Sequence, residues 1–161
     1  KQTELGLYVT ASGAYKMWQA DKDGVKILDV RTAEEYVFVG HAPMARNVPL
    51  MFVTRRWDAE KKMPALKPNP EFLALVKKNY KPTDTILITC RSGGRAKKAV
   101  DLLAKEGYTK VYNIIDGMEG DPVKDPESVF DGKRMKYGWK NSGAPWTYKL
   151  EPALMYLEAT E

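Results

Sequence analysis

A chain of 161 residues with 43% hydrophobic residues is long enough to bury a core but short for two domains. No stretch approaches the roughly 20 apolar residues that a membrane-spanning helix needs, so we expect no membrane span. The net charge is +5, from 26 basic and 21 acidic residues. Lysine pairs are scattered along the chain, and there is no basic stripe with interleaved aromatic residues of the kind that a nucleic-acid-binding protein has. The single cysteine, Cys90, excludes an internal disulfide and a cysteine-rich metal cluster. We therefore expect one globular domain over residues 1–161.

Hydrophobic periodicity predicts strands that alternate with helices along the chain. In chain order, we expect a strand at 7–9, a helix capped by Thr10 or Ser12 and ending near 20, a strand at 26–29, a helix at 33–39, a helix at 70–80, a strand at 85–89, a helix at 95–106, a strand at 110–114 and a C-terminal helix at 151–159. This alternation predicts an α/β fold with a mostly parallel central sheet and helices on both faces. Ligands bind at the carboxyl ends of such strands, where we expect Asp29, Cys90 and Asp116.

Local sequence signals place several helix ends. Thr32 and Glu35 have the spacing of a capping box. Pro70 suits the first turn of a helix, where its missing N–H costs nothing, and Gly107 suits a helix C-terminus. Pro152 begins the predicted C-terminal helix. We expect that helix to pack on its own domain, and a homodimer contact is the alternative.

The most informative segment is the β-branched run 85–89, which leads into Cys90 and is followed by two glycines and a helical pattern. This order predicts a strand, a tight loop and a helix, with the thiol at the mouth of the loop. Backbone N–H groups of residues 91–95 and the N-terminus of the helix would then surround Cys90 and favour its thiolate, which is the nucleophile. Arg91 and Arg95 would hold an anionic substrate or brace the loop. The alternative role for Cys90 is that of a small buried hydrophobe, against which the polar residues behind it argue.

Loop length distinguishes two chemistries that use an anion-binding thiolate. The signature of cysteine-based phosphatases has an arginine six positions after the cysteine, where this chain has Ala96. Here the arginine is Arg95, one position earlier, so the loop forms a smaller ring that suits a single sulfur atom on Cys90 better than a phosphate. At these residues the chain resembles the rhodanese family of sulfurtransferases, whose active-site loop has this six-residue form.

Four other segments extend this resemblance over most of the chain, from about residue 7 to residue 146. They are residues 27–36, 40–49, 116–118 and 138–146. The chain departs from the family where Met44 replaces the usual glycine and where 51–70 and 119–137 are longer; such connections often carry functional loops. An enlarged form of this kind resembles the polysulfide-sulfur transferases of sulfur-metabolising bacteria. Residues 147–161 form a C-terminal extension.

The resemblance implies a rhodanese-like fold and a sulfurtransferase in which Cys90 is the catalytic nucleophile and carries a persulfide. It implies substrate binding by Arg91, Ser92, Gly93, Gly94 and Arg95, and a supporting role for Asp29, Arg31 and His41. The partners would be a small anionic sulfur donor, thiosulfate or polysulfide, and a thiol or cyanide acceptor. We expect no cofactor and no metal ion, since one histidine and one distant cysteine cannot form a metal site. The resemblance to polysulfide transferases leads us to expect a periplasmic location, with the cytoplasm as the alternative.

Two interpretations from other functional classes stay open. The first is a phosphatase or arsenate reductase on the rhodanese fold, against which the loop length argues. The second is a persulfide carrier or protein-binding module with little turnover alone. For His41, the alternative to a supporting role is a Cys–His pair with Cys90.

Overall fold

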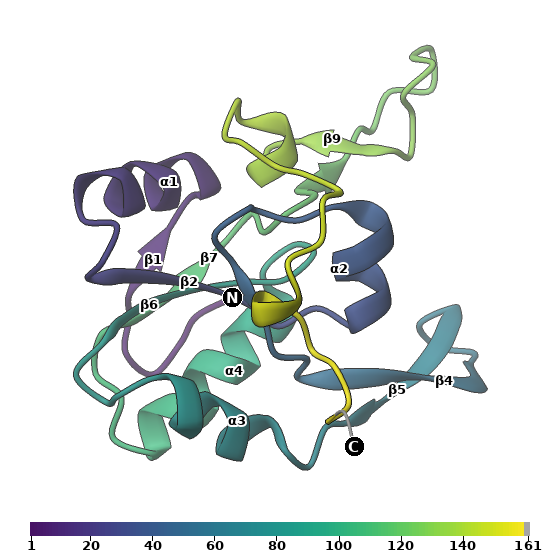
Figure 1. The fold of residues 1–161 in the computed structure, drawn as a ribbon. Helices are drawn as coiled ribbons and strands as arrows, with labels where there is room; N and C mark the ends of the chain where they lie inside the picture. The colour runs from purple at the N-terminus through teal and green to yellow at the C-terminus, as the bar shows by residue number, and fades with distance from the viewer. Residues whose placement is uncertain (160–161) are drawn as a thin grey trace.

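The computed structural model describes residues 1–159 and contains a five-stranded parallel sheet (Figure 1). The strand order is β1-β7-β6-β2-β3, with β1 at Tyr8–Val9, β2 at Val25–Asp29, β3 at Arg46–Asn47, β6 at Thr85–Thr89 and β7 at Val111–Ile114. Strand β6 pairs with β2 on one side and β7 on the other, so Cys90 follows a central strand. The predicted α/β fold with a parallel sheet is confirmed.

Helices cover both faces of this sheet, as predicted. The described residues form four α-helices, α1 (Ala11–Ala20), α2 (Ala33–Val39), α3 (Phe72–Asn79) and α4 (Gly94–Lys105). Successive side chains of a strand point to opposite faces. Accordingly, Ile86 and Ile88 of β6 belong to the apolar cluster that includes Val100 of α4, whereas Leu87 belongs to the cluster that includes Ala14 of α1. The strand before Cys90 is therefore buried on both faces.

Local hydrogen bonds set the starts of two helices, a side-chain capping box at α2 and a turn at Asn69 before α3. Helix α2 begins with the predicted capping box, in which Thr32 accepts from the Glu35 backbone N–H and the Glu35 carboxylate accepts from the Thr32 backbone N–H. Helix α3 begins at Phe72 rather than at Pro70. The reason is Asn69, whose side-chain oxygen accepts a backbone N–H two residues on, and whose carbonyl accepts the N–H of Phe72.

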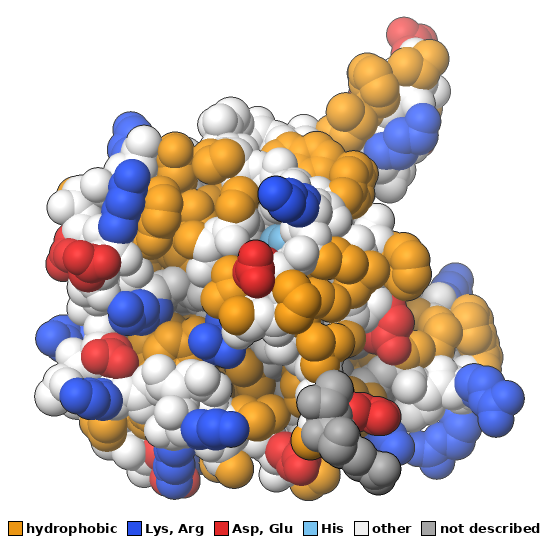
Figure 2. Space-filling model, in the orientation of Figure 1, with side chains coloured by type: hydrophobic (Ala, Val, Ile, Leu, Met, Phe, Trp, Pro, Cys, Tyr) orange, Lys and Arg blue, Asp and Glu red, His pale blue; other side chains and the backbone are white. Residues whose placement is uncertain are grey.

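The two long connections form antiparallel hairpins that project from the domain (Figure 1). The first consists of β4 (Met51–Asp58) and β5 (Met63–Pro68), and the second of the short strands β8 (Asp121–Pro122) and β9 (Arg134–Lys136). In the first hairpin Val53 lies opposite Leu66 and Trp57 lies opposite Pro64, with a bulge between the two pairs. Figure 2 shows apolar side chains along this hairpin and basic side chains at its outer end.

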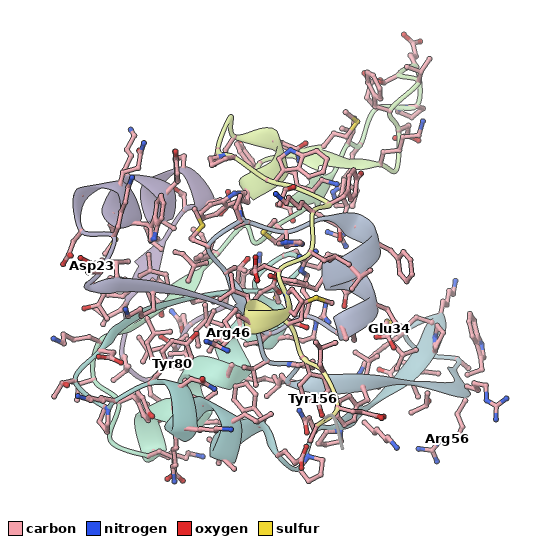
Figure 3. The ribbon with its side chains drawn as sticks, in the orientation of Figure 1. Asp23, Glu34, Arg46, Arg56, Tyr80 and Tyr156 are labelled. Atoms are coloured by element: carbon pink, nitrogen blue, oxygen red, sulfur yellow. The ribbon has the colours of Figure 1, made fainter. Side chains whose placement is uncertain are left out.

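The predicted C-terminal helix at 151–159 is wrong. That segment has one 3₁₀ turn, Pro152–Leu154, and is otherwise extended. Contacts with the domain hold it: Arg46 donates to the Ala153 carbonyl (3.0 Å) and the Tyr156 hydroxyl lies 3.4 Å from the Glu71 carboxylate (Figure 3). The C-terminal segment thus packs on its own domain, as expected, but not as a helix. The homodimer contact stays a prediction. No helix within residues 1–159 has the length and apolar character to cross a membrane.

Candidate active site

Cys90 lies at the carboxyl end of β6, one tight turn before α4. Its side chain is 1% exposed, and its Sγ accepts a hydrogen bond from the Gly93 N–H at 3.1 Å. Helix α4 begins at Gly94, so the positive end of its dipole faces the sulfur from the same side. The structure thus brings the predicted cysteine, a backbone N–H donor and a helix N-terminus together.

Three long-range hydrogen bonds fix the backbone of this loop. The Cys90 carbonyl accepts from the Met118 N–H at 2.8 Å, and the Arg91 carbonyl accepts from the Glu119 N–H at 3.0 Å. The Asn113 side chain donates to the carbonyl of Gly93 at 3.3 Å. Because these partners come from β7 and the segment after it, the loop conformation depends on the neighbouring strand as well as on its own sequence.

Glycine is required at position 93 of the loop. The residue has φ of +95°, a region that residues with a Cβ rarely adopt. A Cβ on Gly93 would also lie 2.6 Å from the carbonyl oxygen of Ile115. Gly94 differs, since a Cβ there would meet nothing within 4 Å. Only the first of the two glycines is therefore needed for the close approach of backbone to sulfur.

Arg95 forms a bidentate ion pair with Glu35 of α2. The Nη1–Oε1 and Nη2–Oε2 distances are 2.6 Å and 2.9 Å, and both side chains are mostly buried. Burial alone would raise the pKa of the Glu35 carboxyl, but the hydrogen bonds and charge of Arg95 outweigh it and hold that pKa below its usual value. Of the two roles considered for Arg95, this geometry favours bracing of the loop over binding a donor.

The predicted supporting residues form a buried frame outside the cleft that holds Cys90. Asp29 accepts from Arg31 Nε and Nη2, the latter at 2.7 Å, and neither side chain is exposed. Arg31 also donates to the carbonyl of Gly40 at 2.8 Å. His41 stacks on Tyr36 at 3.9 Å between ring centroids, and its Nδ1 lies 3.1 Å from the Tyr36 carbonyl oxygen. These contacts are those of packing residues, so the Cys–His pair is not formed.

Asp116 also lies at the carboxyl edge of the sheet, as expected, but it binds backbone. Its carboxylate accepts the N–H of Ala11 at 2.7 Å and the N–H of Gly138 at 2.9 Å. It thereby joins the start of α1 to the segment after β9. A cleft of about 600 Å³ lies beside Asp116, with Tyr8 and Tyr137 in its walls, but Cys90 does not line it.

Cys90 opens into a different cleft of about 570 Å³. The loop side consists of Cys90, Arg91, Ser92, Gly94 and Arg95; the α2 side of Thr32, Glu34, Glu35 and Val39; the hairpin side of Val53, Met63, Pro64 and Leu66; and the remaining wall of Glu119 and Arg134. Three arginines and three glutamates thus balance in charge around the cleft, and one whole wall is apolar. Of the predicted substrate-binding residues, Arg91, Ser92, Gly94 and Arg95 line the cleft, whereas Gly93 is buried and does not line it.

Sequence reasoning did not predict the hairpin wall or the acidic residues of α2. The available signal was the length of the 51–70 connection together with the apolar residues at its two ends, such as Val53 and Leu66. Glu35 carried a signal only for helix capping, and Glu34 carried none. Nothing local to Arg134 or Glu119 pointed to the cleft, because Arg134 reaches it from β9 and Glu119 from the segment before β8.

The cleft has the parts that sulfur-anion chemistry needs. A thiol, a fixed backbone N–H and a helix N-terminus converge, and these groups stabilise negative charge on sulfur without further reorganisation. Within residues 1–159, no three His, Cys, Asp or Glu side chains gather in a way that could hold a metal ion.

A model of the rhodanese-like domain matches residues 12–121 of this chain. The chain belongs to the rhodanese family. Among the relatives of this rhodanese, thiosulfate sulfurtransferase 16 of Arabidopsis thaliana is 38% identical over 94 residues, which are 58% of this chain and 71% of the plant protein. The uncharacterized protein RP600 homolog of Rickettsia rickettsii is 29% identical over 140 residues, 87% of this chain and 96% of that protein.

A solved structure shares the fold over most of both chains. The crystal structure of Rv0390 from M. tuberculosis has a TM-score of 0.67 and 26% identity, covering 88% of this chain and 96% of the other. The predicted rhodanese-like fold is confirmed, and so is membership of a family with sulfurtransferase members.

Proposed function

We propose that this rhodanese is a sulfurtransferase that moves a sulfane sulfur from thiosulfate or polysulfide, through a persulfide on Cys90, to a thiol or cyanide. The observation that carries the proposal is the hydrogen bond from the Gly93 N–H to Cys90 Sγ at the start of α4. A fixed N–H donor beside a helix N-terminus stabilises both the attacking thiolate and the persulfide anion that replaces it.

The loading step is a displacement on sulfur. The Cys90 thiolate attacks the outer sulfur of thiosulfate, the sulfur–sulfur bond of the donor breaks, and sulfite leaves with the electron pair. With polysulfide, a chain shortened by one sulfur leaves instead. Arg91 is exposed at the cleft and binds the donor's charge, while Arg95 is held by Glu35 and braces the loop. The Ser92 hydroxyl supplies a further donor at the rim.

The unloading step returns the enzyme to its starting state. The acceptor, a thiolate or cyanide, attacks the terminal sulfur of the persulfide, and the bond between that sulfur and Cys90 Sγ breaks. The electron pair stays on Cys90 as thiolate, and the acceptor leaves as a new persulfide or as thiocyanate. No proton transfer is needed in either step, which agrees with the packing role of His41.

The test is the intact mass of the protein after incubation with thiosulfate and, in parallel, with polysulfide, followed by cyanide. We expect a gain of one sulfur that cyanide removes and that Cys90→Ser lacks. Turnover of Cys90→Ser should fall by at least about 10³-fold while its circular dichroism stays native. A Cys90→Ser protein that kept most of its activity would contradict the proposal.

The same experiment separates the alternatives from other functional classes. Absence of any sulfur gain, together with hydrolysis of a general phosphatase substrate, would assign the loop to phosphoryl chemistry. Rapid loading with slow release to cyanide would favour a persulfide carrier whose acceptor is another molecule. The donor that loads sulfur onto Cys90 faster would then show whether the protein uses thiosulfate or polysulfide.

A further inference from the structure

The apolar wall of the Cys90 cleft continues outward along one face of the β4–β5 hairpin. Val53 and Leu66 lie directly opposite each other and both line the cleft. Further out, Pro64 also lines the cleft, and its cross-strand partner is Trp57. Directly opposed residues share a face of the hairpin, so Trp57 extends this wall beyond the cleft, and its side chain is 67% exposed. We call this surface, formed by Val53, Trp57, Pro64 and Leu66, the hairpin strip.

Basic side chains surround the outer end of the hairpin strip. Residues 51–68 carry five basic and two acidic side chains, a net charge of +3. Arg55, Arg56, Lys61 and Lys62 are all exposed, and they form the basic group at the outer end of the hairpin in Figure 2, where Figure 3 labels Arg56. An apolar strip with an exposed tryptophan and a positively charged end fits an acidic protein surface better than a small molecule.

A small anionic substrate does not by itself account for the hairpin strip. Thiosulfate would occupy only a fraction of about 570 Å³. The charges around the cleft balance, and Arg95 is already paired with Glu35. A second copy of this chain is a poor occupant, because its net charge of +5 would repel the basic end of the hairpin.

We propose that the β4–β5 hairpin docks a partner protein that presents the sulfur-accepting cysteine on an acidic segment. This inference rests on the proposed function, and it names the acceptor of that reaction. The acidic segment pairs with Arg55 and Arg56, an apolar side chain next to the cysteine packs on Trp57, and the cysteine enters the cleft along the hairpin strip. The partner's thiolate then attacks the terminal sulfur of the Cys90 persulfide. The sulfur–sulfur bond to Cys90 breaks, Cys90 keeps the electron pair, and the partner leaves as a persulfide.

Two synthetic peptides test the proposal on the full chain. Each has a central cysteine between two leucines, with two acidic residues at either end of one peptide and two lysines at either end of the other. The protein is loaded with sulfur from thiosulfate or polysulfide, freed of donor and mixed with each peptide, and loss of the sulfur is followed by intact mass. Each rate is divided by the rate of that peptide with a small disulfide, because neighbouring lysines favour a thiolate.

We expect the acidic peptide to remove the sulfur at least about tenfold faster than the lysine peptide at low salt. The difference should shrink between about 50 mM and about 0.5 M salt, since exposed charges are screened. The Arg55→Ser/Arg56→Ser variant should lose most of the preference, measured as reactivity with peptide relative to cyanide. The matched control, Lys16→Ser/Lys110→Ser, removes the same charge at exposed sites elsewhere and should keep the preference for the acidic peptide. Lys16 is part of α1, which lies on the opposite side of the molecule from β4 and β5 (Figure 1).

A Trp57→Ala variant tests the apolar part of the surface. Its reactivity with the acidic peptide relative to cyanide should fall about tenfold, as for a tryptophan at the centre of an interface. Three results would overturn the docking role and leave the proposed function intact. They are equal rates with the two peptides, a rate with 2-mercaptoethanol equal to that with the acidic peptide, and a peptide preference that survives Arg55→Ser/Arg56→Ser. A dimer in light scattering that this double variant loses would assign the surface to a second copy and also overturn it. Failure of Cys90 to take up sulfur from either donor would overturn both proposals.

Discussion

The Cys90 loop and the β4–β5 hairpin form facing walls of one cleft, yet they are held in different ways. The loop is tied by hydrogen bonds to Met118, Glu119 and Asn113, all at least 20 residues away from their partners in the sequence. The hairpin bonds mainly within itself, as in the 2.6 Å bond from the Thr54 hydroxyl to the Ala65 carbonyl. One wall is therefore part of the cooperative core, while the other is a peripheral element that projects from it.

Under the proposed function, this difference separates two tasks, stabilising a sulfur anion and choosing an acceptor. Stabilising a sulfur anion requires an N–H group fixed relative to Cys90, and a rigid frame supplies that. Choosing an acceptor requires a surface that is free to contact another molecule, and in our proposal the exposed hairpin is that surface. Changes in the frame should therefore alter stability and sulfur loading, whereas changes in the hairpin should leave stability nearly untouched.

The largest expected loss of stability comes from the buried ion pair of the frame. Arg31→Met removes one partner and leaves the Asp29 carboxylate unpaired in the interior, because neither side chain is exposed. We expect a loss of about 3–5 kcal/mol in the free energy of unfolding, measured by urea denaturation. The matched control is Lys77→Met, which breaks the surface pair with Glu106 and should cost at most about 1 kcal/mol. Similar losses in both variants would show that the frame is not the stiffer region.

The glycines of the loop give a second, paired test. Gly93→Ala places a Cβ at φ of +95° and 2.6 Å from the Ile115 carbonyl oxygen. We expect a loss of about 1–3 kcal/mol and at least about tenfold slower sulfur loading, because the N–H that bonds Sγ must move. Gly94→Ala has open space at its Cβ and should change stability by less than about 1 kcal/mol. If the two variants behaved alike, the left-handed turn at Gly93 would not matter to the loop.

The Arg95–Glu35 pair links the loop to α2 and should act in a pH-dependent way. Glu35→Gln keeps the capping box, since glutamine also serves at that position, but it removes the charge that Arg95 needs. We expect a loss of about 1–2 kcal/mol at neutral pH. The folded-state pKa of Glu35 is below its ordinary value of 4.5, so the folded protein binds this proton more weakly than the unfolded chain does. The pair's contribution is thus complete above 4.5 and is lost as the pH falls through the folded-state pKa.

Urea titrations of wild type and Glu35→Gln at a series of pH values check this. The difference in free energy of unfolding should be constant near neutral pH and should shrink below about 4.5. A difference that stayed the same down to acid pH would mean that the stabilisation comes from packing of the side chain rather than from its charge.

The parts of the fold that could be predicted from the sequence are those with strong local signals. The strand Thr85–Thr89 and the helix Ala33–Val39 have the predicted bounds, the first because a β-branched run has no competing structure and the second because Thr32 and Glu35 form a capping box. The position of Cys90 between a strand and a helix followed from the same kind of signal. The Arg95–Glu35 pair could not be predicted, because it joins residues 60 positions apart.

The β4–β5 hairpin was not predicted and the C-terminal helix was predicted wrongly, and both differences have physical causes. The β4–β5 hairpin turns without a glycine; Lys62 takes φ of +53°, a conformation for which the sequence gives no warning. Leu154, Met155 and Leu157 have helical spacing, but so short a segment is a marginal helix alone. The segment forms only the 3₁₀ turn Pro152–Leu154, which the hydrogen bond from Arg46 to the Ala153 carbonyl ties to the domain.

The smallest expected effect concerns the stability of the hairpin itself. Trp57→Ala removes a side chain that is 67% exposed, so little apolar surface returns to water and the free energy of unfolding should fall by less than about 1 kcal/mol. Leu103→Ala, at a fully buried position of α4, should cost about 2–5 kcal/mol in the same urea experiment. If Trp57→Ala cost as much as Leu103→Ala, the hairpin would belong to the cooperative core. Its tryptophan would then have a structural reason to be present, and the case for a docking surface would lose its main support.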